Sequence, residues 1–264
     1  MHFKNKIVWI TGASSGIGKE LAIQLSKENA ILILTSRNEV ALEELKVQLL
    51  HNAKIHLLPF DLTQINLLDN LTRKALNLEG KIDYVIQCAG VSQRSLAMDT
   101  NLDVYQRIMD INYFAPLAIT KALLPYFIKK DEGHFVVISS VAGLYGFPLR
   151  SGYVASKHAL KGFMETIQTE LYKTNIKSTI VFPGRIDTPI SKNALNGQGE
   201  KSQKEDANNK VGMHVTICAH KIIKGIKSNK KNVYIGLSER LLFWIWWFFP
   251  NLYLKIANNK GLKN

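Results

Sequence analysis

The chain has 264 residues, of which 46% are hydrophobic and 21% charged; this composition is typical of a single globular domain and excludes a disordered chain. Its net charge of +13 points to an anionic cofactor or an anionic membrane surface, and it argues against nucleic acid because no aromatic-basic motif accompanies it. No apolar run reaches the roughly 20 residues that a bilayer-spanning helix needs. The two cysteines, Cys88 and Cys218, have no metal-ligand spacing, so we expect no metal site and a reducing, cytoplasmic location.

Seven short apolar runs predict β-strands. They alternate with segments of helical periodicity, such as 16–29 and 39–50. Near-continuous apolar strands separated by helices predict a three-layer α/β fold: a seven-stranded, mainly parallel sheet with helices on both faces, in a single domain over 1–264. Ligands of such sheets bind beyond the carboxyl ends of the strands, so the polar residues at those ends are the functional candidates. The predicted strands are 6–12, 30–37, 54–62, 83–90, 134–140, 177–184 and 232–236.

The turn after the first predicted strand is rich in glycine, with Gly12, Gly16 and Gly18 in the stretch "TGASSGIG". Glycine lets the backbone approach a pyrophosphate, and the N-terminus of the following helix offers free N–H groups. A plain glycine-rich turn is the alternative. The position between a strand and an amphipathic helix favours dinucleotide binding.

The ends of the next three predicted strands carry further candidates. Where an acidic residue would bind a ribose 2′-hydroxyl, this chain has Thr35, Ser36 and Arg37. Arg37 favours NADP(H) over NAD(H) because a guanidinium can bind a 2′-phosphate, although a solvated charge at a helix start is the alternative. Asp61 either receives the adenine amino group or caps the following helix. The small residues at 88–90 would let a cofactor lie close to the backbone.

Two tyrosines have a lysine four positions further on: Tyr153 with Lys157, and Tyr126 with Lys130. Only the first pair lies near the start of a predicted helix that follows a strand ending in serines, Ser139 and Ser140. The second pair lies near the end of its helical segment. We therefore assign the chemistry to Tyr153 and Lys157.

Residues four apart on a helix share one face. Bringing a phenol pKa from about 10 to about 7 requires roughly 4 kcal/mol. An ammonium at about 5 Å and an effective dielectric of about 20 supplies roughly 3 kcal/mol. The spacing therefore predicts that Lys157 lowers the pKa of Tyr153 and that Tyr153 is an acid-base catalyst.

Five motifs in this order, "TGASSGIG" (11–18), "NY" (112–113), "ISSVAG" (138–143), "YVASK" (153–157) and "PGRIDT" (183–188), resemble the short-chain dehydrogenase/reductases over nearly the whole chain. The segments 91–106 and 153–163 are similar to carbonyl reductases of the hydroxysteroid and retinoid type, some of them membrane-associated. The resemblance implies a Rossmann-like fold and an NADP(H)-dependent oxidoreductase acting on a carbonyl or secondary alcohol of a lipophilic substrate.

The resemblance also implies roles for single residues. Tyr153 would be the acid-base catalyst, Lys157 would also bind the nicotinamide ribose, Ser140 would bind the substrate oxygen, and Asn112 would hold a proton-relay water. The simpler alternatives are a helix cap for Ser140, a polar helix residue for Asn112 and a plain turn at 183–184. The implied cofactor contacts are Gly12, Ser14, Ser15, Gly16, Ile17, Gly18, Arg37, Asp61, Leu62, Ala89, Gly90, Asn112, Tyr153, Lys157, Pro183, Gly184, Ile186 and Thr188.

The chain departs from the family pattern in two places. Gln87-Cys88-Ala89-Gly90 replaces the usual asparagine-containing motif, which affects the stability of the central sheet more than catalysis. Ser15 stands where NADP-dependent relatives often have a basic residue, so the cofactor preference rests mainly on Arg37.

The last third of the chain carries the basic charge, with 13 lysines and arginines against 4 acids from 190 to 264. We expect 187–225 to form a substrate loop or lid, including a low-complexity loop at 196–210, and 238–264 to form an apolar-basic tail. The aromatic run at 241–254 is a peripheral membrane contact, a pocket lid or a dimer contact, and its basic surroundings favour the membrane.

The resemblance further implies a homo-oligomer formed through helices 101–129 and 153–173. A non-catalytic dinucleotide-binding sensor or scaffold, docking through the aromatic tail, is the alternative function. The complete set of Ser140, Tyr153 and Lys157 argues against it. A sugar-nucleotide epimerase is disfavoured by the glycine spacing.

Overall fold

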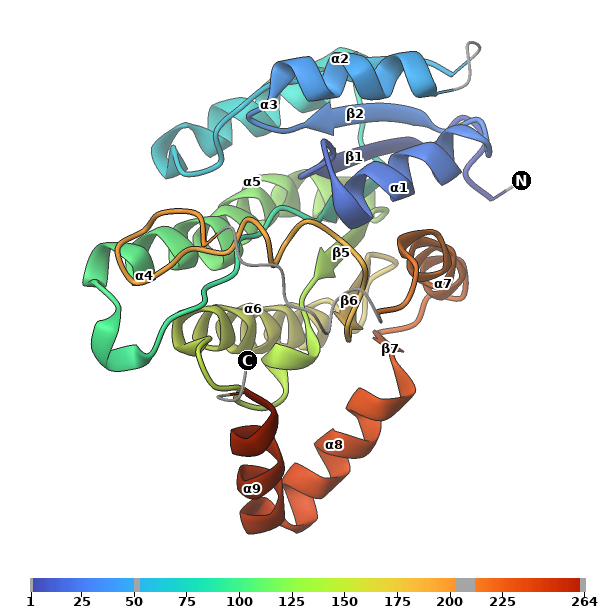
Figure 1. Ribbon diagram of the computed structural model, residues 1–264. Helices are drawn as coiled ribbons and strands as arrows, with labels where there is room; N and C mark the ends of the chain where they lie inside the picture. The colour runs from blue at the N-terminus through green and yellow to red at the C-terminus, as the bar shows by residue number, and fades with distance from the viewer. Residues whose placement is uncertain (1, 50–52, 203–211, 262–264) are drawn as a thin grey trace.

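The computed structural model describes residues 2–49, 53–202 and 212–261. Its centre is one sheet of seven parallel strands in the order β3-β2-β1-β4-β5-β6-β7 (Figure 1). The predicted fold class is confirmed, and every strand pair in the sheet is parallel. Residue 50 of a predicted helix and most of the predicted loop 196–210 lie outside the described residues. The strands are β1 Ile7–Thr11, β2 Ile31–Thr35, β3 Ile55–Leu57, β4 Tyr84–Gln87, β5 His134–Ile138, β6 Lys177–Pro183 and β7 Asn232–Ile235.

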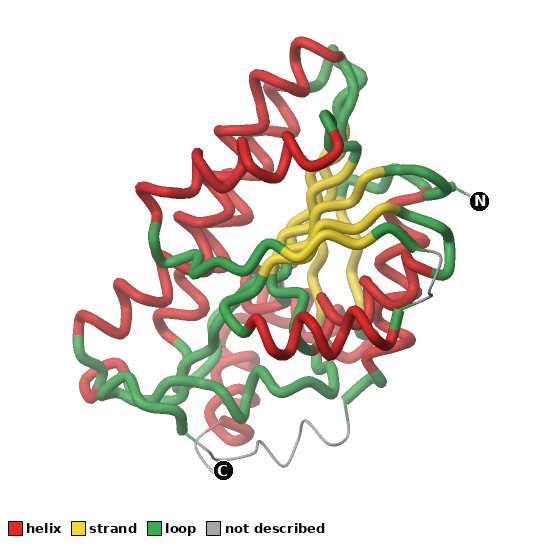
Figure 2. Tube along the Cα trace, turned by 90° about the horizontal axis from the view of Figure 1, so that it is seen from above, coloured by secondary structure: helices red, strands yellow, loops and turns green. Residues whose placement is uncertain are grey.

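Helices cover both faces of the sheet, as Figure 2 shows from above. One face carries α1 (Gly16–Ser26), α2 (Glu39–Gln48) and α7 (Val215–Lys227), whose apolar side chains pack together with the strands in one core cluster. The other face carries α3 (Leu68–Glu79), α5 (Ala115–Lys130) and α6 (Ser151–Glu170), which form the second cluster. Because the strand order reverses between β1 and β4, the crevice for a ligand lies at the carboxyl ends of these two strands.

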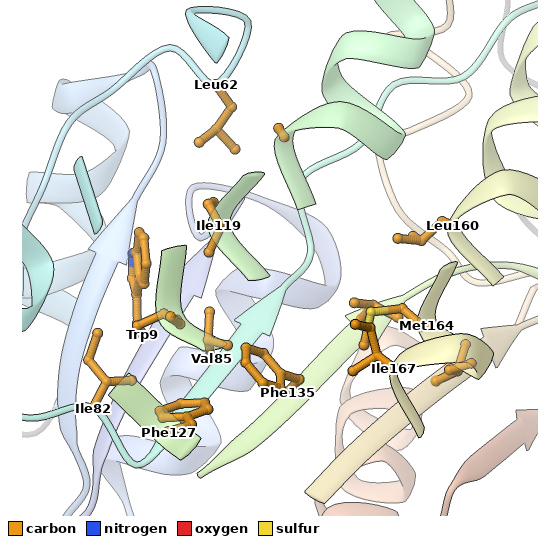
Figure 3. Packing of buried hydrophobic residues seen from close by; sticks show 14 of the residues in the cluster. Trp9, Leu62, Ile82, Val85, Ile119, Phe127, Phe135, Leu160, Met164 and Ile167 are labelled. Carbon is orange, nitrogen blue, oxygen red and sulfur yellow. The ribbon is translucent and has the colours of Figure 1, made fainter. Parts of the chain in front are cut away.

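The second core cluster holds the largest side chains (Figure 3). Trp9 of β1 is fully buried there, and its indole N–H donates to the Thr35 hydroxyl at 2.9 Å, which satisfies the buried donor. Phe127 of α5 packs on Phe135 of β5 with ring centroids 4.7 Å apart. The close packing of helix on strand holds the strand ends in fixed positions.

The helical segment predicted at 101–129 is observed as α4 (Leu102–Met109), a π-helical turn at Asp110–Phe114 and α5. Together Leu102–Lys130 is long and apolar enough to cross a membrane, by length and composition alone. Its apolar side chains Ile119, Leu123 and Phe127 are buried in the core cluster beside the sheet. Leu102–Lys130 is therefore a core helix of the domain.

The predicted tail 238–264 folds into two helices as far as residue 261, beyond which lie residues outside the described part. α8 (Leu237–Phe248) leaves the end of β7, and α9 (Pro250–Gly261) folds back beside it, so that the two form a hairpin at one end of the molecule (Figure 1). Pro250 stands at the first position of α9, where its missing N–H costs no helix hydrogen bond. Short 3₁₀ turns complete the fold at Ile65–Leu67, Ala97–Asp99 and Val141–Gly143.

Candidate active site

A cavity of about 750 Å³ opens at the carboxyl edge of the sheet, and its lining includes residues that follow each of the seven strands. Of the predicted cofactor contacts, Asn112 is the one that does not line it. The cavity therefore brings together the residues that sequence reasoning placed at separate strand ends. Its size is in the range of small-molecule and cofactor sites.

The glycine turn forms one wall of the cavity and fits a phosphate group. Gly12 has a φ of +67°, and a Cβ on it would lie 2.7 Å from the backbone of Ala89. A Cβ on Gly18 would run into the Gly12 carbonyl oxygen. The first turn of α1 begins at Gly16 on the cavity wall, so its backbone N–H groups and the positive end of the helix dipole are available to an anion.

Two further strand ends complete this half of the cavity. The hydroxyls of Ser14 and Ser36 lie 2.7 Å apart and join the glycine turn to the end of β2, beside the exposed Arg37. Asp61 accepts hydrogen bonds from the N–H and hydroxyl of Thr63, at 3.0 and 2.9 Å. Asp61 thus closes a local turn. The next helical turn begins at Ile65 and has Gln64 as its N-cap, so the alternative that Asp61 caps the following helix is wrong.

Ser140, Tyr153 and Lys157 meet at the other end of the cavity. Ser140 follows β5, and its hydroxyl accepts the N–H of Ala142 at 3.1 Å, so its predicted alternative role as a cap is observed as well. The Ser140 side chain is close enough to Tyr153, the third residue of α6, to act on the pKa of its phenol and lower it. Lys157 Nζ donates to the Ile138 carbonyl at 2.9 Å and lies 5.8 Å from the centroid of the Tyr153 ring.

The pKa values of this pair reflect burial. Burial raises the pKa of Tyr153, against the Ser140 hydrogen bond and the Arg150 charge, which lower it. Burial also lowers the pKa of Lys157 to about 8. The predicted lowering of the Tyr153 pKa by Lys157 is therefore wrong, since the pKa is raised. The Lys157 ammonium lies over the Tyr153 ring and donates a hydrogen bond to the Ile138 carbonyl. The loss of hydration on burial therefore has a larger effect on the Tyr153 pKa than the Lys157 charge has.

Asn112 lies fully buried in the π-helical turn, beneath the cavity. Its side-chain amide exchanges hydrogen bonds of 2.9 Å with the N–H and C=O of Val91, and it also donates to Ser156 Oγ at 2.9 Å. Asn112 thus joins the chain after β4 to the helix that carries Tyr153. Its role in holding a water molecule stays a prediction.

Gln87, at the departure from the family motif, has a structural role. It is buried at the end of β4, and its Nε2 donates to the Thr120 hydroxyl on α5 at 3.0 Å. The bond ties the central strand to the helix packed on it. Cys88 lines the cavity, and burial raises the pKa of its thiol.

Sequence reasoning missed several side chains that line the cavity. Glu239 and Leu242 come from α8, and Phe147 and Arg150 come from the loop between β5 and α6. Glu239 accepts the N–H of Arg185 at 3.1 Å and so supports the turn after β6. The local sequence gives no signal for Glu239, because its contact depends on how α8 packs on a turn more than fifty residues away.

Comparison with known proteins supports this picture. Residues 6–199 match the family model described as short chain dehydrogenase. The chain is 37% identical to human dehydrogenase/reductase SDR family member 7 over 97% of this chain and 78% of that protein. It is 36% identical to an SDR family protein 7-like protein of Anopheles gambiae, over 99% of this chain and 85% of that protein.

Two solved structures share the fold. A short chain dehydrogenase/reductase from Burkholderia phymatum in complex with NAD superposes with a TM-score of 0.83, at 19% identity and 96% coverage of both chains. A short chain dehydrogenase from Burkholderia cenocepacia in complex with NADP has a TM-score of 0.79, at 18% identity, covering 97% of this chain and 99% of that one.

Proposed function

The chain belongs to the short-chain dehydrogenase/reductase family of nicotinamide-dependent oxidoreductases, and from this premise we propose that it uses NADP(H) to interconvert a carbonyl group and a secondary alcohol. Tyr153 is the acid-base catalyst. The observation that carries the proposal is the meeting of Tyr153, Ser140 and Lys157 in one cavity with a glycine turn suited to a pyrophosphate.

The bound nicotinamide supplies or accepts the hydride. Side chains of this protein transfer the proton. Tyr153 and Ser140 both line the cavity, where the Tyr153 hydroxyl can donate to a substrate oxygen. Because burial raises its pKa, Tyr153 holds its proton near neutral pH and is suited to act as the acid in carbonyl reduction. Lys157, with a pKa of about 8, is mainly protonated there and stabilises the phenolate that remains after proton transfer.

NADP(H) is proposed over NAD(H) because of Arg37. Its guanidinium lies at the rim of the cavity after β2, where the adenosine ribose of a bound dinucleotide is expected. Arg37 can form charge-assisted bonds to a 2′-phosphate. Ser36 and Asn38 beside it are neutral and would not repel one.

A lipophilic substrate is proposed from apolar side chains in the cavity lining. They come from three segments, beside polar residues of the same lining: Val141 and Phe147 before α6, Ile190 and Leu195 after β6, and Leu242 of α8. Apolar walls with a few polar groups at the reacting end are typical of sites for hydrophobic ligands.

The proposal is tested by following oxidation of NADPH with aldehydes and ketones of rising hydrophobicity. We expect Tyr153→Phe to bind NADPH normally and to lose about a thousandfold in kcat. Tyr126→Phe is the matched control, since Tyr126 also precedes a lysine by four residues but lies away from the cavity, and it should keep full turnover. Equal turnover by both variants would refute the role of Tyr153 and favour the sensor or scaffold.

We also propose that the α8–α9 hairpin contacts an anionic membrane surface. The hairpin exposes several large apolar side chains, while Phe243 and Trp246 are partly buried against the core cluster. The surplus of basic residues from 190 onward complements an anionic surface. The exposed apolar residues are Leu241, Trp244, Trp247, Phe248, Phe249, Leu252 and Leu254.

A dimer through helices 101–129 and 153–173 remains a prediction.

Flotation with anionic and neutral vesicles tests the membrane contact. We expect the protein to float with the anionic vesicles, and a variant carrying Trp244→Gln and Trp247→Gln to remain at the bottom. A protein that stays in solution with both vesicle types at low salt contradicts the membrane contact.

A further inference from the structure

Gln93 lies in the connection after β4, outside every predicted set of site residues, and it is fully buried. We propose that Gln93 is a positioning residue, which holds the first turn of α6 so that Tyr153 presents its hydroxyl to the cavity. The inference rests on the proposed function, since it explains how the acid-base residue of that function is held in place.

The hydrogen bonds of Gln93 carry the proposal. Its Oε1 accepts the N–H of Gly152, the residue before Tyr153, at 2.7 Å. The first N–H groups of any helix lack partners within the helix. Arg150, at the N-cap of α6, has no side-chain acceptor with which to supply one. Gln93 therefore caps the catalytic helix from 59 positions earlier in the chain.

The amide of Gln93 is itself held from its other side. Its Nε2 donates to Thr100 Oγ1 at 2.9 Å and to Ser95 Oγ at 3.2 Å. A longer contact of 3.4 Å reaches Ser151 Oγ, which also pairs with the Tyr105 hydroxyl at 2.7 Å. Both ends of the amide thus have partners, so the orientation of the acceptor toward α6 is fixed.

The contact between Gln93 and α6 is close. A Cβ on Gly152 would lie 2.9 Å from Gln93 Oε1 and 2.9 Å from Tyr105 Cδ1. Glycine at 152 thus allows the amide to sit directly on the helix backbone. Because Gly152 is covalently joined to Tyr153, a shift of this turn moves the catalytic hydroxyl relative to Ser140.

The segment around Gln93 is hydrogen-bonded to the segment around Leu195, which lines the cavity. Gln93 pairs with Leu195 in a parallel bridge, the Leu195 N–H donates to Ser92 O at 2.9 Å, and the Arg94 N–H donates to Leu195 O at 2.7 Å. Gln93 does not line the cavity itself. Its loss should therefore change the catalytic rate more than the binding of the cofactor.

The test compares Gln93→Met with Gln87→Met. Gln87 is also buried and is the last residue of β4, six positions before Gln93, but its amide bonds α5 instead of α6. With NADPH and an aromatic ketone that the wild type reduces, we expect Gln93→Met to lose roughly ten- to a hundredfold in kcat, because small misplacements of a catalytic group have effects of this size. The dissociation constant for NADPH should stay within about threefold of wild type. Gln87→Met should keep its kcat.

A rescue variant separates positioning from simple loss of stability. Gln93→Glu keeps the acceptor for Gly152, so it should recover most of the kcat that Gln93→Met loses. Wild-type kcat and an unchanged pH profile in folded Gln93→Met would overturn the proposal. Equal losses in Gln93→Met and Gln87→Met would overturn it as well, since they would reveal a general effect on folding.

A readout independent of turnover keeps this inference distinct from the proposed function. Hydrogen exchange at the backbone amides of 151–157 should become faster in Gln93→Met and stay unchanged in Gln87→Met. Failure of the wild type to reduce any carbonyl compound would refute the proposed function, yet the exchange measurement would still decide the role of Gln93. Unchanged exchange at 151–157 in Gln93→Met would refute that role.

Discussion

The two edges of the central sheet carry similar side chains that are used in different ways. At the amino edge, the buried Asp83 accepts the Ile7 N–H at 2.7 Å and forms ion pairs of 3.3 Å with Lys6 and Lys81. At the carboxyl edge, the buried Lys157 bonds one backbone carbonyl and faces a cavity. The charge of Asp83 is thus balanced by lysines of the chain itself, whereas Lys157 forms no ion pair among the described residues and lines a cavity that can receive a ligand.

The two tyrosine–lysine pairs show the same contrast. Tyr126 and Lys130 lie at the end of α5, in the segment that leads into the amino end of β5. Tyr153 and Lys157 lie at the start of α6, close to the carboxyl end of the same strand. Identical spacing on a helix therefore gives a candidate active site only where the helix begins at the cavity. In a parallel sheet this is the start of a helix that follows a strand, because such a helix begins at the carboxyl end of that strand, where ligands bind.

Among the substitutions that compare the two edges of the sheet, the largest effect is expected at the lysines. Lys157→Met should lower kcat by roughly a hundredfold, because it removes the cation beside Tyr153 from the site of proton transfer, where a positioned group contributes about a hundredfold or more. Lys130→Met, at the other edge, should leave kcat unchanged. Steady-state rates of NADPH oxidation across a pH series measure both. An equal effect of the two substitutions would show that the edges do not differ in this way.

The next prediction concerns the amino edge, where His134 is buried and its Nε2 lies 2.8 Å from Thr179 Oγ1. Burial lowers the pKa of His134 from 6.5 to about 4. A histidine with a lowered folded-state pKa supports the fold above its unfolded pKa and destabilises it as the pH falls from about 6.5 toward 4. The loss at pH 5 should be about 2 kcal/mol in the free energy of unfolding.

Urea unfolding of wild type and His134→Gln at pH 7 and at pH 5 isolates this contribution. Both proteins carry the same other titrating groups, so the difference between their pH dependences belongs to His134. We expect the wild type to lose more stability than the variant between the two pH values. Equal losses would show that His134 is not held in its neutral form.

Much of the fold and part of the site follow from local sequence patterns. The strands follow from apolar runs, and the glycine turn and the choice of Tyr153 over Tyr126 follow from their places relative to strand ends. The raised pKa of Tyr153 was not predictable, because it depends on how completely α6 is buried. Gln93 was not predictable either, since its partner Gly152 is brought to it only by the packing of α6 against α4, two elements whose separation in the chain hides their contact.

The smallest expected effect comes from comparing the cations at the two edges of the sheet. Lys6 at the amino edge pairs with Asp83 and Glu132. Within the described part of the chain Arg37 forms no ion pair, so its charge is available to a ligand.

Arg37→Ala should weaken NADPH binding about tenfold. This is the lower end of the effect of a hydrogen bond to a charged group, because Arg37 is exposed. Binding of NADH should not change, and Lys46→Ala on α2, away from the cavity, should affect neither cofactor. Isothermal titration with both cofactors provides the measurement. Because the 2′-phosphate is the one group that distinguishes the two dinucleotides, equal weakening of both would show that Arg37 acts on the shape of the site and that the preference for NADP(H) has another origin.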